Sequence, residues 1–129
     1  MISPKSLIYV AGSVFLVYGL LFAAFPNQLL RLTVDGSVTS TSALIDIRAT
    51  YGGMSVAAGV ILLMQGQSSN HKAGLLTVLI LMIGMAVGRS IGLYVDGDAN
   101  LVMYVYLLLE VVVAILALSL LRRTDRVFL

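Results

Sequence analysis

Four long apolar segments constrain this chain more than any other feature of its sequence. They cover residues 7–25, 43–64, 73–94 and 101–121 and are joined by short polar stretches. A helix needs about 20 apolar residues to cross the hydrocarbon core of a bilayer, so all four segments are long enough. Only 11% of the 129 residues are charged, against about 25% in a typical soluble domain. The sequence therefore predicts a single all-α domain, an integral membrane four-helix bundle.

A secretory signal peptide is the alternative interpretation of the first segment, which follows a short polar start containing Lys5. The apolar part of a signal peptide is about 7–15 residues long and ends at an A-x-A-like cleavage site. Residues 7–25 form a longer run, and Phe22-Ala-Ala-Phe25 is a poor cleavage site. We therefore expect a first transmembrane helix that ends at Pro26, because proline interrupts a helix.

The connection between the first two apolar segments is the longest in the chain. Residues 26–34 place apolar side chains among polar ones over about two turns, which favours a short helix lying in the membrane interface. Asp35-Gly36 is a turn signal, and Ser42 is a candidate N-cap for the second transmembrane helix.

Basic residues gather on one side of the expected topology. If the four helices alternate in direction, that side carries Lys5, Lys72, Arg122, Arg123 and Arg126. The opposite side carries Arg31, Asp35, Asp96 and Asp98. Loops rich in Lys and Arg remain in the cytoplasm, so we expect both termini to be cytoplasmic.

Several classes of site are excluded by composition. The chain has no Cys, and its single histidine, His71, lies in a polar loop without a second group that could complete a metal site. Asp96 and Asp98 resemble a fragment of a calcium loop, but the other ligand positions are missing. The basic residues form no patch of the kind that binds nucleic acid. We therefore expect no metal, no cofactor and no nucleic-acid partner.

Apart from Asp46, a first-turn acid favoured by the helix dipole, three charged residues lie inside the predicted spans: Arg48, Arg89 and Glu110. A charge near the centre of a membrane helix costs about 2.5–3.5 kcal/mol on insertion scales, so such residues need partners. The third and fourth helices are antiparallel neighbours, and helical side chains lean toward their own N-terminus. Arg89 and Glu110 then converge from opposite levels, while Arg48 is a second candidate partner for Glu110.

Two interpretations of this polar cluster remain open. An Arg–Glu pair can act as an internal clasp that holds the bundle in register. It can also form a ligand, proton or partner site, with Tyr51 and Tyr106 lining it. A simpler interpretation is that both tyrosines pack as aromatic residues in the core or at the membrane interface.

Small residues form a stripe on each of the two middle helices. The second helix carries Gly52, Ser55 and Gly59, and the third carries Gly84, Gly88 and Gly92. Stripes of this kind let helix backbones approach closely in lipid. Whether they pack within the chain or between copies is left open by the sequence.

The motif that contains the first of these stripes also carries a family resemblance. Arg48-Ala-Thr-Tyr-Gly-Gly53 is followed by Ala57-Ala58-Gly59, then by Gly88-Arg89-Ser-Ile-Gly92 before Asp96-Gly97, and then by Glu110. In this order the motifs resemble the small bacterial membrane family catalogued as domain of unknown function 4345, over essentially the whole chain. The resemblance implies a four-helix protein of the bacterial cytoplasmic membrane without an assigned activity. A more distant likeness to DoxX-like membrane proteins rests on architecture alone.

Our leading functional hypothesis is a non-enzymatic membrane subunit that associates with its own copies or with a larger membrane complex through its glycine stripes. The alternative is a binder or carrier of a small amphiphile, lipid or anion at Arg48, Arg89 and Glu110. An enzyme ranks third: Glu110 could serve as a general acid or base, but the sequence offers no nucleophile, metal cluster or phosphate loop to accompany it.

Overall fold

The computed structural model describes residues 2–126 and confirms the all-α class. Its elements are α1 (Pro4–Ala24), α2 (Pro26–Val34), α3 (Thr41–Ile47), the π-helical segment η1 (Arg48–Met54), α4 (Ser55–Gln67), α5 (Lys72–Val95) and α6 (Leu101–Arg126). Because α3, η1 and α4 run on without a break, the described residues contain four helices long and apolar enough to cross a membrane. These spans are Pro4–Ala24, Thr41–Gln67, Lys72–Val95 and Leu101–Thr124.

The helix boundaries follow from local capping. The Ser3 side chain accepts a hydrogen bond from the Ser6 amide, and Pro4 occupies the first turn, where its missing N–H costs nothing. Pro26 separates α1 from α2 as expected and opens the predicted short helix. The expectation that Ser42 caps the second span was wrong. Ser40 is the cap and accepts from the Ala43 amide, because the helix begins earlier than the apolar run does.

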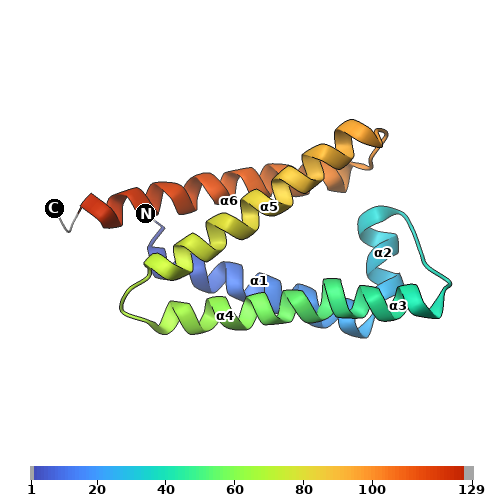
Figure 1. Cartoon of the computed structure of the whole chain (residues 1–129), viewed down its shortest axis with the longest axis horizontal. Coiled ribbons are helices and arrows are strands. Elements are labelled where there is room, and N and C mark those ends of the chain that lie inside the picture. Colours follow the sequence, from blue (N-terminus) through green and yellow to red (C-terminus); the bar gives the residue numbers. More distant parts are fainter. Residues whose placement is uncertain (1, 127–129) are drawn as a thin grey trace.

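The four spans form two helical hairpins (Figure 1). In the first, α1 lies along η1 and α4; in the second, α5 lies along α6. Figure 1 shows the hairpins converging where both termini and the α4–α5 loop lie, which we call the basic end, and separating toward α2, which we call the α2 end. The buried core lies near the basic end, where Ile8, Leu62, Leu75, Val78 and Ala117 are completely buried. Residues from all four spans meet there.

Within the first hairpin, glycines allow α1 and the η1–α4 helix to approach closely. A Cβ added at Gly19 would lie 2.6 Å from the Val56 amide nitrogen, and one added at Gly59 would lie 2.6 Å from that of Leu16. Real Cβ atoms do not come so close to backbone, so these positions require glycine. The stripe that contains Gly52 and Gly59 therefore packs inside the chain, against α1.

The π-helical turn interrupts the second span beside the last turns of α1. The Thr50 hydroxyl donates to the Asp46 carbonyl over 2.7 Å, which competes with the regular backbone ladder. The adjacent Gly52-Gly53 pair has low helix propensity. Both features favour a wider turn here, and π-helical turns occur frequently at functional sites.

At the α2 end, α2 connects the two hairpins. The Asn100 side-chain amide donates to the Thr33 carbonyl over 3.0 Å and to the Asp35 carboxylate over 2.8 Å. Asn27 binds both the amide and the carbonyl of Val38, each over 3.0 Å, and so fixes the loop that follows α2. Figure 1 shows α2 standing between the ends of the two hairpins.

Candidate functional site

An ion pair inside the second hairpin is the centre of the candidate site. The Arg89 Nε donates to both carboxylate oxygens of Glu110 over 3.1 Å, and Nη2 donates to Oε1 over 2.6 Å. Glu110 is buried at 5% exposure, and the Arg89 side chain is 21% exposed. Multiple charge-assisted bonds of this kind are strong and fix the orientation of both groups. The pairing expected from the two helix directions is thus present in the structure.

Residues of α6 surround the rest of the guanidinium. Its central carbon lies 5.1 Å from the centroid of the Tyr106 ring, within range of a cation–π interaction. Nη1 donates to the sulfur of Met103 over 3.2 Å. A guanidinium has five N–H groups, and these contacts engage one on each nitrogen. Two N–H groups of Arg89 therefore have no acceptor among the described residues.

The first hairpin contributes an aromatic row to the same region. The rings of Tyr18 and Phe22 have centroids 4.7 Å apart, and those of Phe22 and Tyr51 are stacked 5.3 Å apart. Tyr18 is within electrostatic range of Arg89, Glu110 and Tyr106 on the other hairpin. The row therefore runs from Tyr51 in η1 to Tyr18 in α1, on the side of α1 that faces the ion pair.

The site lies inside the spans, toward the α2 end. Tyr18 lies six residues before the end of α1, and Arg89 lies six residues before the end of α5. Tyr106 lies five residues after the start of α6. At a rise of 1.5 Å per residue, all three side chains start about 8–9 Å from the helix ends. Polar groups from three helices therefore lie at a similar depth.

Three tyrosine hydroxyls in this region lack a hydrogen bond. Within the described part of the chain, no such bond involves the hydroxyl of Tyr18, Tyr51 or Tyr106. Tyr18 and Tyr106 are half-buried, and Tyr51 is 49% exposed. A tyrosine hydroxyl removed from water usually finds a partner. The site thus combines a neutralised ion pair with unused donors.

Arg48 does not join this cluster. Its guanidinium donates to the carbonyls of Ala23 and Ala24, so it caps the C-terminal end of α1. Cations are favoured at that end because the last carbonyls of a helix have no partner within it. The sequence-based expectation that Arg48 could serve Glu110 is not met, since the free carbonyls of α1 lie nearer.

The second glycine stripe behaves differently from the first. A Cβ added at Gly84 or Gly88 would meet no described atom within 4 Å, and one at Gly92 would meet only the Asp96 carboxylate at 3.7 Å. Ser55, in the first stripe, is half-buried at the start of α4. Close packing inside the chain therefore involves the glycines of the first stripe but not Gly84, Gly88 or Gly92 of α5.

Sequence reasoning missed Tyr18, Phe22 and Met103. Tyr18 lies in the part of α1 that follows Lys5 and carries no charge, so no ionisable residue drew attention to it. One signal was available: Tyr18 is a polar aromatic residue as far from the end of its helix as Arg89 is from the end of α5. Equal depth in a bundle of alternating helices would have placed the two side by side.

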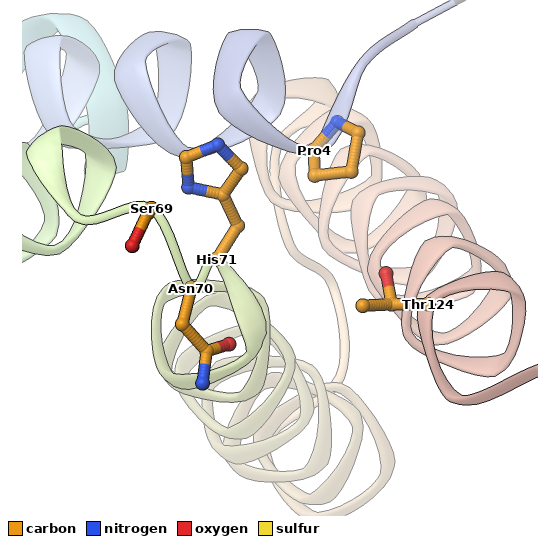
Figure 2. A pocket seen from close by; sticks show the side chains of 5 residues that line it. All are labelled: Pro4, Ser69, Asn70, His71 and Thr124. Carbon is orange, nitrogen blue, oxygen red and sulfur yellow. The ribbon is translucent and has the colours of Figure 1, made fainter. Parts of the chain in front are cut away.

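A separate hollow of about 310 Å³ lies at the basic end (Figure 2). It is lined by Pro4 from α1, by Ser69, Asn70 and His71 from the α4–α5 loop, and by Thr124 from α6. No group of three metal-binding side chains occurs among the described residues, here or elsewhere.

Comparison with known protein families shows where the chain has relatives. Residues 4–121 match the model of a family described as a domain of unknown function, DUF4345. No curated protein and no solved structure matches the chain. The matched region includes the ion pair, all three tyrosines and both glycine stripes.

Proposed function

This chain belongs to the DUF4345 family, whose description assigns no activity, and from the geometry of the ion-pair site we propose that it binds the polar group of a small, uncharged amphiphile inside the membrane. One observation carries the proposal: unused hydroxyls of Tyr18 and Tyr106 lie near the Arg89–Glu110 pair within the spans, and Tyr51 continues the aromatic row through Phe22. Lipid offers few partners to such donors, so a molecule with a hydrogen-bond acceptor would satisfy them.

The charge balance favours an uncharged ligand over an anion. Glu110 already neutralises Arg89 through three hydrogen bonds, so an anion would find no uncompensated positive charge. It would also have to leave water for the membrane interior, which is costly for a charged group. A carbonyl or ester oxygen can accept from the tyrosine hydroxyls and the remaining N–H groups of Arg89 without that cost.

The position of the site favours access from the lipid. The α2 helix bridges the hairpins above the site through the bonds of Asn100 to Thr33 and Asp35. Tyr51, by contrast, is 49% exposed on the side of the bundle. An amphiphile already dissolved in the membrane can approach from this side with its apolar tail remaining in lipid.

Photolabelling tests this proposal. An alkyl ketone carrying a photoactivatable diazirine is added to the protein in nanodiscs, and labelled protein is counted by intact mass. A net hydrogen bond contributes about 0.5–1.5 kcal/mol, so the double change Tyr18→Phe and Tyr106→Phe should lower labelling about tenfold. Tyr104→Phe is the matched control, because Tyr104 lies two residues from Tyr106 and is 50% exposed. Equal labelling of parent and double variant would rule the site out.

A specific observation also favours a second function, that of a self-associating or accessory membrane subunit. Gly84 and Gly88 leave an open strip along α5, although glycine weakens a helix that gains no close contact from it. A helix of a second copy or of a larger assembly could pack against this strip. Gly88→Leu should then shift the native mass in mild detergent toward the monomer, while the adjacent change Val87→Leu should not. An unchanged native mass in Gly88→Leu would exclude the strip as an interface.

A further inference from the structure

The hollow at the basic end is independent of the ion-pair site and lies at the opposite end of the spans. Three segments build it: the first turn of α1, the loop before α5 and the last turns of α6. Figure 2 shows the His71 ring extending toward α1, with Pro4 and Thr124 on the far side. Its volume of about 310 Å³ leaves room for a group of several heavy atoms.

Polar atoms around the hollow have unused hydrogen-bonding capacity. His71 Nδ1 is buried and has no hydrogen-bond partner among the residues that the structure describes. The Asn70 side-chain oxygen accepts from the Lys72 amide over 3.0 Å, which leaves the Asn70 NH₂ group free to donate. The Ser69 hydroxyl has no bond within the described residues either. Thr124 is partly satisfied, because its hydroxyl donates to the Leu120 carbonyl over 2.9 Å.

The electrostatic surroundings of the hollow are positive. Both α1 and α5 begin here, so the positive ends of two helix dipoles point toward it. The C-terminal end of α6 has the opposite sign, but Arg122 and Arg123 lie in its last turns. By sequence this end carries Lys5, Lys72, Arg122, Arg123 and Arg126 against the single acid Asp125.

We infer that the hollow holds a phosphate group, whose oxygens accept a hydrogen bond from the side-chain NH₂ of Asn70. Basic pockets between membrane helices on the cytoplasmic side are recognition sites for anionic lipid headgroups. The positive-inside rule places the basic end on that side. A phosphate diester of a lipid headgroup and free inorganic phosphate share this chemistry, and the lipid is the source at hand in the membrane.

A matched pair of charge changes tests the inference. Asn70→Asp brings a negative charge into the hollow and keeps the oxygen that accepts from the Lys72 amide, so the loop stays folded. Gln67→Glu introduces the same charge near the same loop, at an exposed position that does not line the hollow. Protein is incorporated into nanodiscs of phosphatidylcholine with a minor share of phosphatidylglycerol. Retained phosphatidylglycerol is then counted by native mass spectrometry.

Asn70→Asp should lower the amount of retained phosphatidylglycerol about fivefold, which corresponds to about 1 kcal/mol for one charge contact. Gln67→Glu should retain an amount within about twofold of the parent. An equal loss in both variants would assign the retention to the general charge of this end and overturn the inference. No loss in either variant would overturn it as well.

A second measurement separates the two sources of phosphate. Inorganic phosphate is added to the protein in pure phosphatidylcholine nanodiscs, and thermal stability is recorded for the parent and for Asn70→Asp. A rise in Tm only for the parent identifies a site open to the free ion. No rise, together with selective retention of phosphatidylglycerol, identifies a lipid headgroup site. Absence of both responses in the parent would refute the phosphate site.

Discussion

Arg89 and Glu110 are 21 positions apart in sequence, yet Nη2 of the one lies 2.6 Å from Oε1 of the other. The contact joins α5 to α6 inside the spans, where few other polar groups can compensate a charge. The ion pair therefore holds α5 and α6 of the second hairpin together. The consequences for stability can be separated from those for ligand binding.

Glu110→Gln should destabilise the protein by about 3 kcal/mol, because it leaves the Arg89 charge without its partner. Adding Arg89→Gln should recover much of this loss, since the stranded charge is then gone. A double-mutant cycle of unfolding free energies in mixed micelles measures the coupling. Arg48→Gln is the control: Arg48 binds carbonyls of α1, so its effect should add to that of Glu110→Gln. Additivity of Arg89→Gln and Glu110→Gln would contradict the clasp.

Substituting glycine should lower stability at Gly59 in α4 but not at Gly88 in α5. Gly59→Ala forces a Cβ to within 2.6 Å of the Leu16 nitrogen and should cost at least about 2 kcal/mol by separating α1 from α4. Gly88→Ala meets no atom and should leave the monomer as stable or up to about 1 kcal/mol more stable, because alanine favours the helix. Unfolding curves of the two variants in the same micelles provide the measurement. Equal destabilisation would mean that α5 packs more closely than the structure places it.

Single cysteines should report the orientation in the membrane, since the chain has none of its own. Ser37 and Ser69 are both exposed and lie in loops at opposite ends of the bundle. With both termini in the cytoplasm, an impermeant thiol reagent should label Ser37→Cys in intact cells and Ser69→Cys only after lysis. The opposite labelling pattern would invert the topology and put the hollow at the basic end on the outer side.

Asn100→Ala should release α2 from the second hairpin. It removes the bonds to the Thr33 carbonyl and the Asp35 carboxylate, together worth about 1–2 kcal/mol. Hydrogen–deuterium exchange in α2 should accelerate about tenfold, while exchange in α4 stays unchanged. The control is Asn27→Ala, which loosens the Val38 loop but keeps the tether to Asn100. An unchanged exchange rate in α2 would show that the burial of Leu30, and not the bonds of Asn100, keeps α2 in place.

The sequence predicts the fold well because lipid permits few solutions. Apolar length alone locates the four spans, and Pro26 divides α1 from α2. The Arg89–Glu110 contact also follows from the sequence, because the short turn makes α5 and α6 antiparallel neighbours. Charges inside a membrane have few candidate partners, so helix direction narrows the partners of Glu110 to Arg89 and Arg48.

Other features depend on three-dimensional context that a residue pattern does not contain. Arg48 binds backbone carbonyls at the end of α1. Every residue has a backbone carbonyl, so the sequence does not indicate which carbonyls will bind a side chain. The two glycine stripes look alike, but only the one facing α1 is packed. The π-helical turn arises from a balance between Thr50, a glycine pair and the neighbouring helix, which shifts by small energies.

The buried core near the basic end also limits how the molecule can move. Residues of all four spans are fixed together there, whereas α2 and the bonds of Asn100 are the polar link between the hairpins at the other end. A spreading of the hairpins therefore enlarges the cross-section of the protein in one leaflet and leaves its area in the other unchanged. The work of such a movement is done against the lateral pressure of that leaflet.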